Sequence, residues 1–476
     1  MKVAKKNIVV LLLDTLRASD AYGSGNLRTL DSISRNATKY TSAVAPGTWT
    51  APTHAALFTN RSVSNIKNVS QDFLSNGTYK IDPWLVKTKF LQEQENTIAR
   101  KMSIQGYQSV LMSNNPFLTS YTNLAVGFDR VQDIWMHTNI KYNKRMLKRF
   151  SPILNGGAKA RVAMINVGYA CTRLLPKTLM DMTYLKSRRM LYKGTSKVDG
   201  TYRLDRGAMD TNKIIGSYLK YNYSYKPQFI FVNYMEAHEH YPVHDRNIVQ
   251  DKWMYLGGIE EMSEYNMGRL HNGYLKRLRY LDKSIRSTLA SLKENGILDN
   301  ATVIITSDHG QFFGEHGLLY HSLPPYEGVA RVPLIAVNYE NGRIVKMKDV
   351  VDTPVSISAL HDSILNLASG KHDYLNGNLR KDRHVICEHT GISEGWDEKL
   401  LRMMAPRSKS AAQILKIKRK YNIKVTAVYR KNIKLMHYFG RKKDELYDVL
   451  KDPDESSNII DQNRGLAIEM SKAAYN

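Results

Sequence analysis

The chain contains little cysteine and no long apolar run. Only two of its 476 residues are cysteines, Cys171 and Cys387, and they lie far apart in the sequence. Two isolated cysteines exclude a disulfide framework and a cysteine-based zinc cluster, and they are typical of a reducing compartment. No apolar stretch approaches the roughly 18–20 residues that a membrane span needs.

The start of the chain resembles a secretory signal, because lysines precede the apolar residues 8–13. This run is too short for a signal peptide, ends at Asp14 and is followed by no small-residue cleavage site. We therefore interpret it as a buried strand and expect a cytoplasmic protein.

Acidic residues are too few to balance the basic ones. Asp and Glu number 44 against 69 Lys and Arg, so the formal net charge is +25. This charge predicts attraction to polyanions such as nucleic acid, anionic lipid head groups, or phosphorylated or sulfated substrates. Many basic residues fall at about 131–210, which is either an inserted, solvated surface or a surface that binds a polyanion or a membrane. No motif for specific nucleic-acid recognition is present.

Short apolar runs of strand length recur along the first 379 residues. They lie at Asn7–Leu13, 229–233, 302–306 and 332–337. Continuous apolar runs of this length are typical of strands that are buried on both faces of a parallel sheet. Apolar residues at helical spacing predict a helix over 274–296, between two of these runs. A second helix is expected over 351–367, after the last run, with Pro354 in its first turn. The pattern predicts an α/β fold.

The pattern changes beyond about residue 380. Four short, β-prone segments follow with no long helix between them apart from a charged stretch near 398–420, and they lie at 384–388, 424–429, 434–438 and 445–449. This predicts a small antiparallel sheet against a helix. We therefore expect a catalytic domain over residues 1–379, which carries the basic insertion, and a small C-terminal α+β domain over 380–476.

Polar residues follow two of the expected strands directly. Asp14 follows the first strand, and Asp308 and His309 come shortly after the strand at 302–306. Ligands of open α/β sheets bind beyond the carboxyl ends of the strands. These residues are therefore candidate ligands, although Asp14 alone is also explained as the cap of the next helix.

The stretch GTWTAPTHAALFTNR, residues 47–61, predicts a turn followed by a helix. Pro52 suits the first turn, because its missing N–H costs nothing there. Thr50 then lies at the helix N-terminus, where backbone N–H groups and the helix dipole favour an anion. Taken alone, Thr50 is also explained as a simple N-cap.

Several histidines and glutamates lie after the expected strand at 229–233 and near His309. They are Glu236, His238, Glu239, His240 and, further along, His321. A lone histidine is more often structural, but this clustering at a strand end favours a site. His238 and His321 are candidates for holding a substrate or protonating a leaving group.

Asp14, Thr50, Asp308 and His309 together can hold one divalent cation. Oxygen ligands with one imidazole suit Ca²⁺, Mn²⁺, Mg²⁺ or Zn²⁺. A cation bound by the Thr50 hydroxyl would lower its pKa and activate it as a nucleophile. Glu236, His238 and His240 can supply ligands to a second cation, but we favour one.

The sequence resembles the sulfatase branch of the alkaline phosphatase superfamily. The matching segments follow the family's order and include NIVVLLLDTLRAS, WTAPTHAALFT, FVNYMEAHEHYP, TSDHGQFFGEHG and ELYDVLKDPDESSNI. The resemblance implies a large, mostly parallel sheet sandwiched by helices, with metal ligands at Asp14, Asp308 and His309. It places Thr50 at the nucleophile position, and His238 and His321 at substrate-contacting and acid/base positions.

The resemblance also assigns Asn115 to the substrate pocket, and it shows three departures from the family pattern. Thr50 stands where typical sulfatases have a Cys or Ser that becomes formylglycine, so we expect no formylglycine here. His54 replaces the family's Arg, which makes it a candidate substrate-binding residue. Thr15 stands where a second Asp is typical.

These residues predict a sulfatase-like, metal-dependent hydrolase that cleaves sulfate or phosphate esters through a metal-bound Thr50 nucleophile. Its substrate is expected to be an anionic ester, either free or linked to a glycan or a lipid. Two alternatives remain open. One is a phospho- or sulfotransferase that uses the same covalent intermediate, and the other is a non-catalytic protein that binds an anionic glycan or lipid head group.

Overall fold

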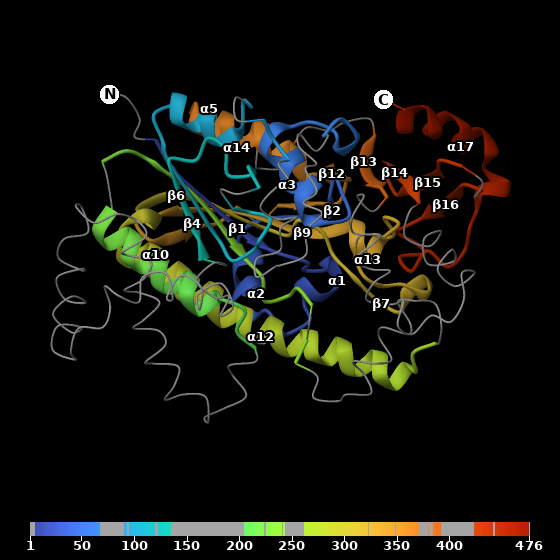
Figure 1. Cartoon of the computed structure of the whole chain (residues 1–476), viewed down its shortest axis with the longest axis horizontal. Coiled ribbons are helices and arrows are strands. Elements are labelled where there is room, and N and C mark those ends of the chain that lie inside the picture. The colour runs from blue at the N-terminus through green and yellow to red at the C-terminus, as the bar shows by residue number, and fades with distance from the viewer. Residues whose placement is uncertain are drawn as a thin grey trace, which may run out of the picture.

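The computed structural model describes most of the chain outside the basic insertion. The described residues are 5–66, 90–92, 95–119, 122–134, 204–222, 225–239, 241–242, 261–321, 323–347, 349–370, 379, 384–391, 423–440 and 443–475. They form a large sheet with helices on both faces and a smaller sheet beside it (Figure 1). Most of the insertion predicted at 131–210, together with Cys171 and the charged stretch at 398–420, lies outside these residues.

The large sheet runs in the order β11-β2-β9-β6-β1-β5-β3-β4. Its central strand is β1, which pairs in parallel with β5 and β6, and β3 pairs in parallel with β5 and β4. β9 is antiparallel to both β6 and β2. The strands span Asn7–Leu13 (β1), Thr38–Val44 (β2), Gln108–Ser113 (β3), Arg130–Asp133 (β4), Gln228–Tyr234 (β5), Asn300–Thr306 (β6) and Arg331–Glu340 (β9). The predicted large, mostly parallel sheet is confirmed.

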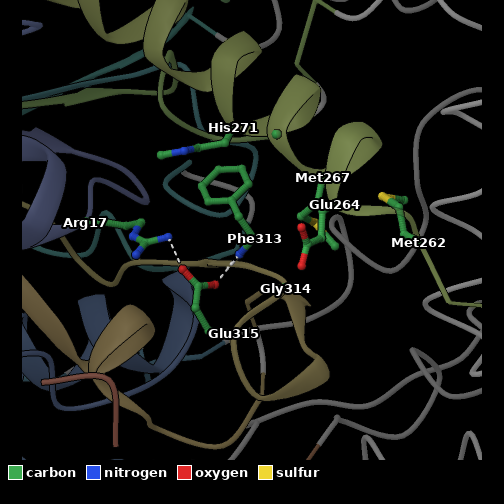
Figure 2. A pocket seen from close by; sticks show the side chains of 9 residues that line it. Arg17, Met262, Glu264, Met267, His271, Phe313, Gly314 and Glu315 are labelled. Carbon is green, nitrogen blue, oxygen red and sulfur yellow. Dashed lines mark hydrogen bonds and ion pairs between the residues drawn. The ribbon is translucent and has the colours of Figure 1, made fainter. Parts of the chain in front are cut away.

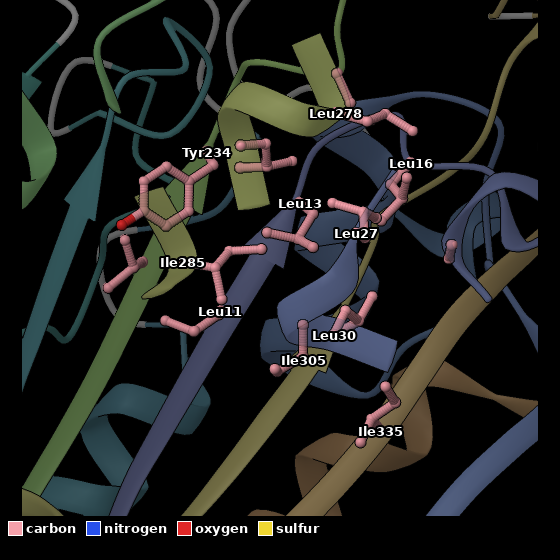
Figure 3. Packing of buried hydrophobic residues seen from close by; sticks show 14 of the residues in the cluster. Leu11, Leu13, Leu16, Leu27, Leu30, Tyr234, Leu278, Ile285, Ile305 and Ile335 are labelled. Carbon is pink, nitrogen blue, oxygen red and sulfur yellow. The ribbon is translucent and has the colours of Figure 1, made fainter. Parts of the chain in front are cut away.

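Alternate residues of β1 enter two different hydrophobic layers. Leu11 and Leu13 pack with Leu278 and Ile285 (Figure 3). Leu12 belongs to the layer on the opposite face of the sheet. The first layer lies under α2 (Arg28–Ser34), α10 (Ala208–Asn222) and α12 (Glu264–Glu294), and the second lies under α3 (Thr50–Thr59), α5 (Ile98–Ile104) and α14 (Leu360–Ala368). Burial on both faces explains why the strand is apolar throughout.

Two predicted helices differ from the observed ones. α12 begins at Glu264, with Ser263 as its N-cap, and therefore extends well before the expected start at residue 274. The prediction of a helix over 351–367 is wrong for the first half of that range. There, Val355–Ser356 (β12) pairs with β2, and α14 begins only at Leu360 after a 3₁₀ turn over Ile357–Ala359. The buried, β-branched Val355 favours a strand at the sheet edge.

The smaller sheet consists of four antiparallel strands in chain order, as predicted. They are β13 (Val385–Thr390), β14 (Lys424–Arg430), β15 (Ile433–Tyr438) and β16 (Glu445–Asp448). α17 (Arg464–Ser471), which the sequence pattern did not predict, packs Ala467 and Met470 against one face. Cys387 and Val425 on the other face join the hydrophobic layer of the large sheet, so the two sheets share a core. The boundary at 379/380 stays a prediction.

The remaining elements are short. They are α1 (Ala18–Ala21), β7 (Phe312–Phe313), β8 (Leu319–Tyr320), α13 (Glu327–Ala330), β10 (Arg343–Val345) and β11 (Val350–Val351). Within the described part of the chain, every helix is too short or too polar to cross a membrane.

Candidate active site

Asp14 is a completely buried carboxylate at the carboxyl end of β1. Its Oδ2 accepts a hydrogen bond from Asn115 Nδ2 at 2.6 Å, and Asn233 Nδ2 lies 3.5 Å away. Its backbone N–H donates to the Tyr234 carbonyl, which holds the end of β1 against β5. Asp14 does not cap the next helix, because the N-cap of α1 is Arg17. Asn115 therefore orients this carboxylate, and its assignment to the substrate pocket stays a prediction.

Asp308 is the second buried carboxylate, and it lies beyond the end of β6. Its Oδ1 accepts the backbone N–H groups of Thr15 at 3.1 Å and of His309 at 2.9 Å. Thr15 has a φ of 63°, which is rare for a β-branched residue. The turn after Asp14 therefore holds a strained residue that joins the ends of β1 and β6.

His309 connects the carboxylates to Thr50. Its Nδ1 contacts the Gly310 carbonyl at 2.9 Å, so this nitrogen carries the proton and Nε2 has the free lone pair. Nε2 lies 3.4 Å from Asp308 Oδ2 and 3.5 Å from Thr50 Oγ1. Burial lowers the pKa of His309 to about 4, against the pull of Asp308, so the ring is neutral at pH 7, as a metal ligand must be.

Thr50 is the first residue of α3, and it is buried. The N-cap of α3 is Trp49, and Thr50 Oγ1 points to His309 instead. The interpretation of Thr50 as a simple N-cap is therefore wrong. One turn later, His54 Nδ1 contacts the Thr50 carbonyl at 2.8 Å and lies 3.8 Å from Asp308 Oδ2. His54 is thus bound to the backbone of Thr50 and has no exposed surface.

The donor set of Asp14, Asp308 and His309 fits a divalent cation. One ligand atom from each of these residues lies within 4.8 Å of the other two. Asp14 Oδ1 and Asp308 Oδ2 are buried and accept no hydrogen bond. Buried polar atoms are normally satisfied, and two such oxygens in one place would be satisfied by a divalent cation. Burial, together with the charge of Asp308, raises the pKa of Asp14 well above its usual value.

His238, Glu239 and His321 form a second cluster. Glu239 Oε2 lies 3.1 Å from His238 Nδ1 and 3.4 Å from His321 Nδ1. The ring of His321 also lies against that of His309, with centroids 4.5 Å apart, so the two clusters are neighbours. Burial, with smaller contributions from His321 and Arg206, lowers the pKa of His238 to about 3 although Glu239 opposes this. Burial has the same effect on His321, but Glu239 and Asp308 outweigh it and raise its pKa.

Glu236 takes no part in either cluster. Its Oε1 accepts the backbone N–H groups of Arg206 and Ala208, both at 2.9 Å, where α10 begins. This oxygen therefore serves the start of α10, and the role of Glu236 as a ligand to a second cation stays a prediction. His240, the other candidate from this segment, lies outside the described residues.

Sequence reasoning did not identify the arginines that support His238. Arg206 Nη1 and Arg277 Nη1 both donate to its carbonyl at 2.9 Å. Arg206 also donates to the Glu239 carbonyl. Arg277 is buried on α12, and a basic residue on the inner face of that amphipathic helix was the signal that could have revealed it.

The loops that carry Asp14 and His309 continue to a pocket of about 440 Å³. Figure 2 shows Arg17 and Phe313 in its wall, with His271 beside the Phe313 ring. Arg17 Nη1 pairs with Glu315 Oε1 at 2.7 Å, and Glu315 Oε2 accepts the Phe313 N–H at 2.6 Å. This ion pair joins the loop after β1 to the loop after β6.

Most of the predicted site residues come together at one edge of the sheet. The candidate ligands Asp14, Asp308 and His309 lie together, and Thr50 adjoins His309. His54 and Asn115 contact this group. His238 and His321 adjoin it through His309. Glu239, Asn233 and Thr15 complete the arrangement, and only the folded chain gives them these positions.

The same arrangement of strands and helices occurs in solved sulfatases. A putative sulfatase from Bacteroides thetaiotaomicron superimposes with a TM-score of 0.63 at 16% identity, covering 99% of this chain and 91% of that one. The phosphonate monoester hydrolase of Agrobacterium radiobacter gives a TM-score of 0.57 at 16% identity, covering 99% and 94%. At identities this low, the structural similarity shows a shared fold alone.

Sequence comparison agrees with the fold. An arylsulfatase from Clostridium perfringens is 26% identical over 195 residues, which are 40% of this chain and 36% of that protein. Among eight curated sulfatases that it matches, the chain spans between 14% and 38% of their lengths. The family model for Sulfatase matches residues 6–371, which is most of the chain. The chain therefore belongs to the sulfatase family.

Proposed function

We propose that this protein is a metal-dependent hydrolase of sulfate or phosphate esters, and that Thr50 Oγ1 is its nucleophile. The observation that supports this most directly is the position of the Thr50 hydroxyl. It lies 3.5 Å from His309 Nε2 at the N-terminus of α3, next to two buried carboxylate oxygens that accept no hydrogen bond. The hydroxyl does not cap α3, because the N-cap is Trp49. It faces the site in which an anionic ester would bind.

The chain's own groups support a double displacement. Thr50 Oγ1 attacks the sulfur or phosphorus, the bond to the ester oxygen breaks, and the departing alcohol takes up a proton. Water then attacks the threonine ester, which releases inorganic sulfate or phosphate and returns the proton to Thr50. A divalent cation held by Asp14, Asp308 and His309 would supply positive charge that lowers the pKa of the hydroxyl and neutralises the ester.

The α3 N-terminus contributes independently of the cation. Its first backbone N–H groups have no partner within the helix, and together with the helix dipole they stabilise the oxygens of a bound sulfate or phosphate. The contact between His54 Nδ1 and the Thr50 carbonyl keeps the first turn of α3 in place. His54 thus acts as a positioning residue for the nucleophile.

Our proposal does not include the aldehyde chemistry of formylglycine, because the nucleophile is a threonine. The β-methyl group of Thr50 prevents oxidation to the same aldehyde, so the hydroxyl itself must attack. Similar folds occur in proteins named for sulfate esters and for phosphonate monoesters. We include both ester classes, free or linked to a glycan or lipid. We retain the cytoplasm as the proposed location, and polyanion or membrane binding as the proposed role of the basic insertion.

The deciding experiment compares ester hydrolysis by three substitutions in α3. Purified protein is assayed with p-nitrophenyl sulfate, p-nitrophenyl phosphate, bis-p-nitrophenyl phosphate and a phenylphosphonate ester, each with Ca²⁺, Mn²⁺, Mg²⁺ or Zn²⁺. We expect Thr50→Ala to lower kcat by roughly 10³-fold or more, because removal of a nucleophile is rarely compensated. Thr50→Ser should keep most activity. Thr59→Ala, which loses only a hydrogen bond to the Ala55 carbonyl, is the matched control.

The outcomes separate the alternatives. Full turnover by Thr50→Ala contradicts the nucleophile assignment. Transfer of the sulfate or phosphate group to an added alcohol, with loss of this transfer in Thr50→Ala, would instead establish a transferase. Ligand binding without turnover of any ester would establish a non-catalytic binder.

A further inference from the structure

We propose that the outer face of α2 and α12 is a docking surface for an anionic lipid membrane. Both helices cover the same face of the large sheet (Figure 1). Six exposed basic side chains define their outer face, which we call the α2/α12 surface: Arg28, Arg35, Lys276, Arg279, Lys283 and Arg286. The proposal goes beyond the proposed function, because it requires no catalysis by the chain.

The spacing of the basic residues on α12 places their side chains together. Positions 276, 279, 283 and 286 recur at intervals of three or four residues, which is one side of a helix. Leu278, Leu281 and Ile285 occupy the opposite side and are buried in the core. The basic residues of α12 therefore form a stripe about 15 Å long on the solvent side, at a rise of about 1.5 Å per residue.

Hydrogen bonds join α2 to this stripe. Arg279 Nη1 donates to Asn26 Oδ1 at 2.6 Å, just before α2 begins. The N–H and the hydroxyl of Thr29 donate to Asp282 at 2.7 and 3.0 Å, and Arg286 Nε donates to the Thr29 hydroxyl at 3.3 Å. The two helices therefore present one continuous surface.

The cations of the α2/α12 surface have almost no acidic partners. Of the six, only Arg286 has a carboxylate of the described chain within 4.0 Å, that of Asp282 at 3.7 Å. Basic residues of the C-terminal sheet and helix are paired instead, as Arg430 is with Glu469 and Arg464 with Asp461, both at 2.8 Å. Charges of both signs are normally interspersed on a protein surface. A face with such an excess of positive charge attracts an external polyanion.

A pocket of about 600 Å³ opens on this face beside α2. Its wall holds two serine side chains, three basic side chains and one acidic one, those of Ser32, Ser34, Arg28, Arg35, Lys39 and Asp31. Asp31 Oδ1 already accepts the Gly23 N–H at 2.8 Å. Guanidinium groups bind phosphate through paired hydrogen bonds. The pocket therefore fits one phosphate head group of the membrane.

The shape of the surface favours a membrane over a nucleic acid. Single strands are bound in grooves whose exposed aromatic side chains stack on the bases, and α12 exposes no aromatic side chain between Lys276 and Lys293, all of which the structure describes. The major groove of a duplex, about 12 Å wide, admits one helix, whereas this surface is two helices wide. A membrane is a plane of charge that can contact both helices at once.

The same stretch of α12 exposes no large apolar side chain. A helix that inserts into the interface of a membrane carries such side chains on one face. The α2/α12 surface therefore binds at the level of the head groups, through charge alone, and salt should release it.

The test measures binding of the full-length protein to lipid vesicles by sedimentation. Vesicles of phosphatidylcholine alone are compared with vesicles that also contain phosphatidylglycerol, each at about 50 mM and about 500 mM salt. We expect binding only to the anionic vesicles and only at the lower salt. Arg28→Gln, Arg35→Gln and Lys283→Gln combined should weaken this binding roughly 100-fold, because each basic residue near an anionic membrane contributes about 1 kcal/mol.

The matched control removes the same charge elsewhere. It combines Arg430→Gln, Lys451→Gln and Arg464→Gln, each at a residue that has an acidic partner in the C-terminal part of the chain. This variant should bind anionic vesicles like the native protein. Hydrolysis of soluble esters should be the same in both variants, so the proposed function is tested separately. Circular dichroism checks that both variants fold.

Each other outcome overturns the proposal. Equal binding by the native protein and the α2/α12 variant would mean that another part of the chain binds the membrane, and Gln substitutions at Lys144, Arg145 and Lys148 would then test the basic insertion. Binding to duplex DNA without binding to vesicles would identify a nucleic acid as the occupant. Vesicle binding that persists at the higher salt would contradict attachment through charge alone.

Discussion

The side-chain amide of Asn115 donates a hydrogen bond to Asp14 Oδ2 at 2.6 Å. The two residues lie at the ends of separate strands, so this contact joins β3 to β1 at the candidate site. It occupies one oxygen of Asp14 and leaves Oδ1 for a cation. Asn115 N–H is in turn held by Ser113 Oγ, which orients the turn after β3.

Removing this amide should weaken cation binding. We expect Asn115→Leu to lower the affinity for Zn²⁺ or Mn²⁺ by roughly 10–100-fold, because groups that orient a metal ligand contribute effects of that size. Competition with a chelating dye measures the change. Asn295→Leu at the C-terminal end of α12, where the amide binds only the Ser291 carbonyl, is the control. An unchanged affinity in Asn115→Leu would show that Asp14 needs no such support.

Cation removal should make stability depend on pH. Without the ion, burial and the nearby Asp308 raise the pKa of Asp14 above its ordinary 3.8. A carboxyl with a raised pKa binds a proton more tightly in the folded state, so the apo protein loses stability as pH rises from 3.8 toward the raised pKa. We expect chelator to lower the melting temperature more at pH 8 than at about pH 4, close to the ordinary pKa of the carboxyl. Asp14→Asn should abolish that difference, and an equal effect at both pH values contradicts the assignment.

Glu236 should reduce stability at neutral and higher pH. Burial, with a smaller contribution from Asp205, raises its pKa from 4.5 to about 7. The folded state therefore binds more protons than the unfolded state between these values, and stability falls as pH rises across them. The loss is on the order of 3 kcal/mol at about 1.4 kcal/mol per pKa unit.

Glu236→Gln removes this titration while its amide oxygen still accepts the backbone N–H groups of Arg206 and Ala208. Urea unfolding at pH 4.5 and pH 7.5 should show a gain for the variant over the native protein at the higher pH only. A constant difference between the two proteins would mean that Glu236 does not titrate in this interval.

Lys434 should stabilise the contact between the two sheets. It is fully buried on β15, 3.1 Å from Glu327 Oε1 on α13 and 2.7 Å from Glu455 Oε1. Lys434→Met leaves Glu455 without this cation and Glu327 with Arg331 alone, and we expect a loss of about 3–5 kcal/mol in the free energy of unfolding. Adding Glu455→Gln should recover part of it. A loss in the single variant below about 1 kcal/mol, the range of an exposed pair, would contradict this role.

Local sequence was sufficient to predict the strands and to bring together the candidate ligands Asp14, Asp308 and His309. β1 and β6 are apolar because both faces of each strand are covered, and this leaves a continuous run that can be recognised without a structure. Asp14, Asp308 and His309 follow such runs closely, and the carboxyl ends of neighbouring parallel strands meet at one edge. Their proximity therefore followed from the pattern alone.

The roles of the surrounding side chains depended on the folded chain. Glu236 and Glu239 lie three residues apart in one turn, yet Glu236 binds the start of α10 and Glu239 faces His321. Likewise, the sequence around Val355 predicts the first turn of a helix, but in the folded chain Val355 pairs with β2 as part of a strand. Local patterning reflects which residues are buried, but the direction of a polar side chain is set by partners that folding brings from remote parts of the chain.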